Sequence, residues 1–163
     1  MDKNYKLPKF GIGPLYGLIV FGMTFAAVML RGNQLFIGAR MNSTAGAIWA
    51  IIGLGLIYLG CYLWVKAVLV EKLDDALKAG ELRTTGVFSM VRNPIYSAIM
   101  LVCSGLLCVV GNLWFMLLPF FYWLLMTVMV KLTEEKTLRK MFGSEYEEYC
   151  KRVNRCIPYP TSR

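Results

Sequence analysis

Two polar segments flank a long apolar stretch, and they hold the residues best suited to chemistry. The first is Arg92-Asn93-Pro94-Ile95-Tyr96. The second begins at Glu134-Glu135 and continues through Gly143, Tyr146, Tyr149 and Arg155 to Pro158. A guanidinium, two adjacent carboxylates and several tyrosines can bind a ligand that carries both positive and negative groups. The chain has no histidine, so any proton transfer has to use other side chains or the substrate itself.

The residues between these segments carry almost no charge and are interrupted only at Gly111-Asn112. We expect helices at 94–110 and 112–131, joined as a hairpin that brings both polar segments to one membrane face. Asn93 is expected to cap the first helix with its side chain, followed by Pro94 at the first helical position. Pro119 predicts a kink or a local break in the second helix.

Glu134 and Glu135 are expected at the end of that second helix. Neighbouring helical residues point about 100° apart, so one carboxylate should face inward and the other should meet solvent. After Gly143, a capping box at Ser144-Glu145-Tyr146-Glu147 predicts a helix of about ten residues. Its tyrosines should share one face and dock either on the bilayer surface or over the end of the hairpin.

Two further apolar runs, 13–31 and 45–70, precede the hairpin. Each approaches or exceeds the roughly 20 residues needed to cross a bilayer. Hydrophobic residues make up 57% of the 163 residues, above the usual share for a soluble domain. The sequence therefore predicts an all-α polytopic membrane protein with about four transmembrane helices.

The chain is long enough for one domain, 1–163, which we divide into two parts. Residues 1–80 should hold the first two spans and a short interfacial helix near 71–77, and residues 81–163 should form the catalytic half. Glycines in the first two spans favour close helix packing, either within the chain or in a homodimer. No cysteine spacing resembles a metal site, and the apolar composition gives no indication of nucleic-acid binding.

Positive charge is distributed unevenly along the chain. Alternate sides of the four predicted spans carry 15 and 2 Lys and Arg residues, with Lys66 inside the second span. The positive-inside rule then predicts that both termini, and with them both polar segments, lie in the cytoplasm. Most of the lysines are expected to meet lipid headgroups, whereas Arg92 and Arg155 are expected to have another role.

Six short motifs occur in order over residues 80–160. They are Thr85-Gly86-Val87-Phe88, Val91-Arg92-Asn93-Pro94-Ile95-Tyr96, Glu134-Glu135-Lys136-Thr137-Leu138, Phe142-Gly143-Ser144-Glu145-Tyr146, Arg152-Val153 and Ile157-Pro158. Their order and spacing resemble the isoprenylcysteine carboxyl methyltransferases and the related phospholipid methyltransferases. Members of these families are integral membrane enzymes that use S-adenosylmethionine.

The resemblance implies a cytoplasm-facing cofactor pocket built by the hairpin and the C-terminal segment. Arg92, Glu134 and Glu135 would be the catalytic candidates, with Arg92 binding the cofactor or an acceptor anion and a glutamate meeting its cationic or hydroxyl groups. The pocket walls would come from Asn93, Pro94, Tyr96, Tyr146, Tyr149, Arg152 and Pro158. Asn93 stands where many relatives have histidine, and an amide cannot act as a titrating base.

We therefore expect methyl transfer from S-adenosylmethionine to a lipophilic acceptor reached from the bilayer. An isoprenylcysteine carboxylate is the first candidate, and a phospholipid or a small molecule with an amine or thiol is the alternative. Other classes stay open: a small transporter, a non-catalytic membrane interaction protein, or a nicotinamide-dependent reductase. The transporter is the weaker hypothesis because spans 13–31, 94–110 and 112–131 have no ionisable residue in mid-membrane.

Overall fold

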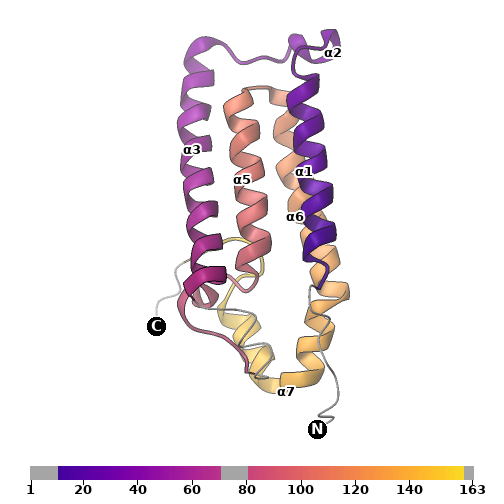
Figure 1. The fold of residues 1–163 in the computed structure, drawn as a ribbon, viewed down its shortest axis with the longest axis vertical. Coiled ribbons are helices and arrows are strands. Elements are labelled where there is room, and N and C mark those ends of the chain that lie inside the picture. The colour runs from indigo at the N-terminus through magenta and orange to yellow at the C-terminus, as the bar shows by residue number, and fades with distance from the viewer. Residues whose placement is uncertain (1–10, 71–80, 160–163) are drawn as a thin grey trace.

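The computed structural model describes residues 11–70 and 81–159, and the regular structure in these ranges is helical (Figure 1). The predicted interfacial helix at 71–77 lies outside the described residues. In chain order the elements are α1 (Gly13–Leu30), α2 (Gln34–Ile37), α3 (Ser43–Val65), the π-helical turn η1 (Lys66–Val70), the 3₁₀ helix η2 (Gly86–Ser89), α5 (Pro94–Val110), the 3₁₀ helix η3 (Leu113–Leu117), α6 (Leu118–Leu132) and α7 (Glu134–Arg152).

Three of the described segments are long and apolar enough to cross a membrane: Gly13–Leu30, Ser43–Val70 and Leu113–Leu132. Helix α5 has 17 residues, and at a rise of 1.5 Å per residue it extends about 26 Å, slightly less than a hydrocarbon core of about 30 Å. Many large apolar side chains of the three longer segments are exposed, as expected for surfaces that face lipid. The prediction of an all-α polytopic membrane protein is confirmed.

Helix α5 lies at the centre of an elongated bundle and packs against α1, α3 and α6 (Figure 1). More than half of its residues are buried, so the segment that is too short to span a membrane by length alone is surrounded mainly by protein. The core between α1, α5 and α6 is built from large side chains such as Tyr16, Tyr122 and Met126, all fully buried.

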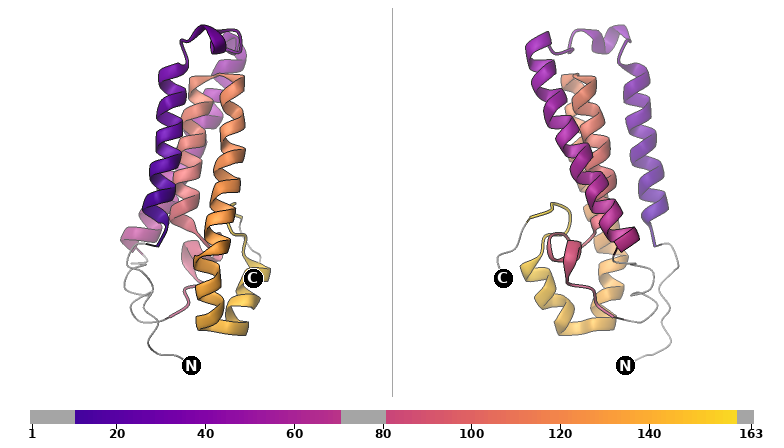
Figure 2. Two further views of the ribbon diagram at one scale, coloured as in Figure 1. Left: turned by 90° about the vertical axis from the view of Figure 1, so that its right-hand side faces the viewer. Right: turned by 60° about the vertical axis from the view of Figure 1, so that its left-hand side comes forward.

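Helix α3 crosses α5 at a slant, and glycines allow their backbones to meet (Figure 2). A Cβ atom added at Gly53 would lie 2.5 Å from the carbonyl oxygen of Gly105, and one added at Gly105 would lie 2.5 Å from the carbonyl oxygen of Gly53. Gly60 is similarly close to Ala98 of α5. These glycines serve packing within the chain, whereas Gly46 and Gly55 meet open space.

The end of the last span differs from the prediction. Helix α6 ends at Leu132, and Thr133 separates it from α7, so Glu134 and Glu135 begin a new helix. The Thr133 hydroxyl donates a hydrogen bond to the Met129 carbonyl at 2.7 Å, a local bond that competes with helical continuation. The predicted break at Pro119 is confirmed, because η3 changes to α6 one residue before this proline.

Helix α7 bends at Gly143, where φ is 52° and ψ is −125°. The second half turns back beneath the bundle toward the residues that precede α5 (Figure 2). Tyr146 and Tyr149 are buried in a small apolar cluster that includes Leu138 and Phe142 from before the bend. The predicted aromatic face therefore docks on protein, at the end of the bundle where α5 begins.

Candidate active site

Three distant segments meet at this end of the bundle: residues 87–93, the first turn of α7, and residues 153–159. The last of them is tied to the start of α5 by backbone hydrogen bonds. The Arg92 amide donates to the Asn154 carbonyl at 2.9 Å, and the Tyr159 amide donates to the Met90 carbonyl at 3.0 Å. We call residues 153–159 the C-terminal strap.

Side chains of the α5 region also hold the strap. The Ser97 hydroxyl donates to the Cys156 carbonyl at 2.6 Å, and the Asn93 side-chain amide donates to the Arg155 carbonyl at 3.1 Å. The prediction that the Asn93 side chain caps α5 is wrong, since its amide is directed to the strap and no side-chain cap bond is present. The turn before Pro94 is stabilised by tertiary contacts instead.

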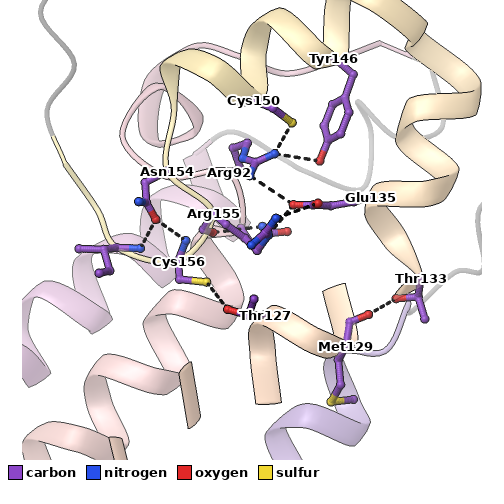
Figure 3. A network of polar contacts seen from close by, with 12 residues as sticks. Arg92, Thr127, Met129, Thr133, Glu135, Tyr146, Cys150, Asn154, Arg155 and Cys156 are labelled. Atoms are coloured by element: carbon purple, nitrogen blue, oxygen red, sulfur yellow. Dashed lines mark hydrogen bonds and ion pairs between the residues drawn. The ribbon is translucent and has the colours of Figure 1, made fainter. Parts of the chain in front are cut away.

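Glu135 is the centre of the site and is only 2% exposed (Figure 3). Arg155 donates to both carboxylate oxygens, at 2.6 Å from Nε and 3.0 Å from Nη2. Arg92 forms a second ion pair with the same carboxylate, at 3.3 Å. We call these three residues the Arg–Glu–Arg cluster.

Electrostatics within this cluster keep the carboxylate ionised. Burial by itself raises the pKa of Glu135, but the hydrogen bond from Arg155 and the positive charge of Arg92 outweigh it, so the pKa lies below its ordinary value. The same hydrogen bond to Glu135 raises the pKa of Arg155 above its ordinary value, because it stabilises the charged guanidinium. With two guanidinium groups and one carboxylate, the cluster carries one surplus positive charge.

Arg92 has a second set of neighbours on α7. One terminal nitrogen donates to Cys150 Sγ and to the Tyr146 hydroxyl, the latter at 3.5 Å, and the guanidinium lies 5.9 Å from the centre of the Tyr146 ring (Figure 3). Burial raises the pKa of Tyr146, so its hydroxyl stays protonated at neutral pH. Arg92 Nε is buried and has no hydrogen-bond partner among the described residues.

Glu134 belongs to a different contact. Its Oε1 accepts a hydrogen bond from the Tyr96 hydroxyl and another, at 3.4 Å, from the Ile12 amide just before α1. Glu134 is half-buried, so the expected division into one inward and one solvated carboxylate is only partly correct. No cation among the described residues forms an ion pair with Glu134.

The remaining predicted residues fall into two groups. Pro94, Tyr146 and Tyr149 are buried on the segments that carry the cluster, Tyr96 is buried beside Glu134, and Pro158 is half-buried on the strap. The Tyr149 hydroxyl donates to the Phe88 carbonyl at 2.6 Å, so it holds the backbone that leads to Arg92. Arg152 is exposed and lines a shallow surface depression with Glu148 and Lys151, apart from the cluster.

Arg155 is the member of the site that the motif comparison left out. The charge pattern sets Arg155 apart together with Arg92, but the family motif contains Arg152, three residues earlier, and so does not assign Arg155 to the pocket. Helix α7 ends at Arg152, and the non-helical strap then turns Arg155 toward Glu135. In residues 11–70 and 81–159, no group of three or more acidic or cysteine side chains is arranged to hold a metal ion.

A sequence model of the phospholipid methyltransferases matches residues 48–145, which is more than half of the chain. The chain belongs to the phospholipid methyltransferase family. It is thus a membrane methyltransferase by family, as the motifs had indicated. Neither the curated proteins nor the solved structures provide a match to the whole chain or a part of it.

The phospholipid methyltransferase match covers more of the bundle than the motifs did. It begins within α3 and so includes the helix that packs on α5 through glycines. It also contains Arg92, Glu134 and Glu135. It ends at Glu145, before the C-terminal strap, so Arg155 lies beyond the matched residues.

Proposed function

We propose that this protein transfers a methyl group from S-adenosylmethionine to a lipid acceptor that reaches the site from the bilayer. The observation that carries the proposal is the buried Arg–Glu–Arg cluster at the end of an apolar bundle. A surplus buried charge is unfavourable in isolation, so this arrangement favours an anionic ligand group. The family membership supports methyl transfer as the reaction.

The side chains of the site fit this cofactor. S-adenosylmethionine supplies a methyl group on a positively charged sulfur and also carries a carboxylate, an ammonium and an adenine. Arg92 would bind the carboxylate, because its buried Nε has no acceptor within the described chain. Aromatic residues beside the cluster, among them Tyr146, would form a wall of the cofactor site. Glu135 would hold the Arg92 guanidinium in its orientation.

Glu134 favours an amine acceptor. A half-buried carboxylate without a cation partner in the described residues attracts an ammonium headgroup and repels a second carboxylate. It can also accept the proton that an ammonium must lose before its nitrogen attacks a methyl group, a role that no histidine is present to fill. We therefore prefer a phospholipid amine as the methyl acceptor. The isoprenylcysteine carboxylate, which the resemblance of the motifs suggested first, becomes the alternative.

We infer further that the site faces the cytoplasm, because the described cationic residues gather at its end of the bundle. Protease protection of a C-terminal tag in sealed inverted vesicles tests this orientation. Protection of the tag inside such vesicles would contradict it.

The function is tested with purified protein, labelled S-adenosylmethionine and vesicles of phosphatidylethanolamine. We expect labelled lipid from the wild type and strong loss in Arg92→Ala and Glu135→Ala. Glu147→Gln is the matched control, because Glu147 is on the same helix but is exposed. A farnesylated cysteine as the alternative acceptor separates the amine from the carboxylate hypothesis. Failure of the wild type to bind the cofactor would reject the proposed function altogether.

A further inference from the structure

Arg155 and Arg92 contact Glu135 in different ways. Arg155 forms two hydrogen bonds, one to each oxygen, whereas the nearest atoms of Arg92 and Glu135 are 3.3 Å apart. A two-point arginine–carboxylate pair fixes orientation as well as charge. Glu135 is therefore held mainly by the strap residue, and Arg92 is a looser second partner.

The looser contact leaves donor capacity on Arg92. One of its terminal nitrogens is directed to Cys150 and Tyr146, and its Nε is buried without an acceptor in the described residues. The Arg92 side chain is 7% exposed, so water has little access to it. An unpaired buried donor is unfavourable, and an acceptor on a bound ligand would remove that penalty.

Without Arg155, Glu135 would have one arginine partner instead of two. Arg92 would then turn toward both carboxylate oxygens, since a buried carboxylate that lacks full pairing is strongly unfavourable. The Arg92 Nε donor, which has no partner among the described residues, would then donate to Glu135. Competition for Glu135 thus connects the strap to the ligand-binding capacity of Arg92.

We propose that Arg155 is a positioning residue that occupies Glu135 so that Arg92 stays available for the carboxylate of the cofactor. This inference rests on the proposed function. It assigns a role to a residue beyond the family match, and it gives Arg155 the place that the motifs assigned to Arg152. The backbone bonds of the strap fix where Arg155 reaches the cluster.

The test measures binding of two probes by calorimetry: S-adenosylmethionine and its decarboxylated form. In Arg155→Gln we expect affinity for S-adenosylmethionine to fall about tenfold to a hundredfold, the worth of one charged hydrogen bond. Affinity for the decarboxylated probe should stay as in the wild type. In turnover assays the KM for the cofactor should rise while kcat at saturation changes little.

Arg155→Lys guards against a folding failure. Lysine keeps the charge beside Glu135 but cannot form the two-point pair, so the loss for S-adenosylmethionine should be intermediate. Arg139→Gln, which changes an exposed arginine of α7, is the matched control and should bind both probes normally.

The outcomes separate the two proposals. If the wild type binds neither probe, the proposed function is wrong. If the wild type binds and Arg155→Gln binds S-adenosylmethionine equally well, only the role of Arg155 is wrong. Equal losses for both probes would overturn it as well, because a purely structural effect does not depend on the ligand carboxylate. The same holds if Arg152→Gln gives the selective loss instead.

Discussion

Replacing Glu135 by glutamine should destabilise the protein far more than any surface substitution. The change leaves Arg92 and Arg155 without their shared counter-charge in a site where the carboxylate is 2% exposed. Removing one partner of a buried ion pair is unfavourable by about 3–5 kcal/mol. Glutamine can still accept a hydrogen bond from Arg155, and that side chain is 23% exposed, so we expect about 3 kcal/mol.

The loss should depend on pH in a defined direction. The pKa of Glu135 in the folded protein lies below its ordinary value of 4.5, because hydrogen bonding and two arginines outweigh burial. Its stabilising contribution is therefore complete above pH 4.5 and declines as the pH falls toward the folded pKa. The difference between wild type and Glu135→Gln should be constant near neutrality and shrink in acid.

Urea unfolding in detergent micelles, repeated between pH 7 and pH 3.5, measures this difference. Glu147→Gln provides the control, since its pair with Arg139 spans 3.9 Å and both side chains are more than half exposed. Such a pair contributes less than about 1 kcal/mol. A Glu135→Gln protein as stable as the wild type at pH 7, or a difference that does not vary with pH, would refute the reasoning about the cluster.

Two further substitutions test the packing around the site. Gly11→Ala should destabilise the protein by about 1–2 kcal/mol, because φ is 45° there and the new methyl group would press on the Glu134 carboxylate; an unchanged unfolding midpoint would contradict this. Gly105→Ala should destabilise it by about 1–3 kcal/mol, since its Cβ would lie 2.5 Å from the Gly53 carbonyl oxygen. Gly55→Ala, which meets open space, should change the midpoint little, and equal effects at both positions would show that α3 and α5 are not in close contact.

The membrane spans were predictable because their signals are local. Hydrophobic runs and turn residues placed the hairpin at 94–110 and 112–131, and the structure has α5 at Pro94–Val110 and the following span at Leu113–Leu132. Gly111 ends α5 in the left-handed conformation, with φ at 66°, which glycine adopts readily. Such signals depend on a few adjacent residues, so one sequence suffices to detect them.

The details of the site were less predictable because tertiary contacts decide them. Asn93 is of a residue type that commonly caps helices, and it directly precedes α5. Its side-chain amide nevertheless donates to the Arg155 carbonyl, 62 residues away. Glu134 and Glu135 follow an apolar helix without an obvious break, and only the geometry at Thr133 places them on a new helix. Neither the Asn93–Arg155 hydrogen bond nor the helix boundary at Thr133 is marked by a periodic pattern in the sequence.

Arg152 and Arg155 show most clearly where sequence reasoning ends. Both are arginines in a short basic stretch; Arg155 is included in the second polar segment, but the family motif favours Arg152 for the pocket. The helix ends at Arg152, and non-helical chain separates its exposed guanidinium from that of Arg155, three residues later, which reaches a buried carboxylate. The strap can hold that position because Arg92, Asn93 and Ser97 bond to three consecutive carbonyls, those of Asn154, Arg155 and Cys156. The segment that resembles a helix start by sequence therefore anchors the strap and so brings Arg155 to Glu135. The surplus positive charge on which the proposed cofactor binding rests depends on this anchoring.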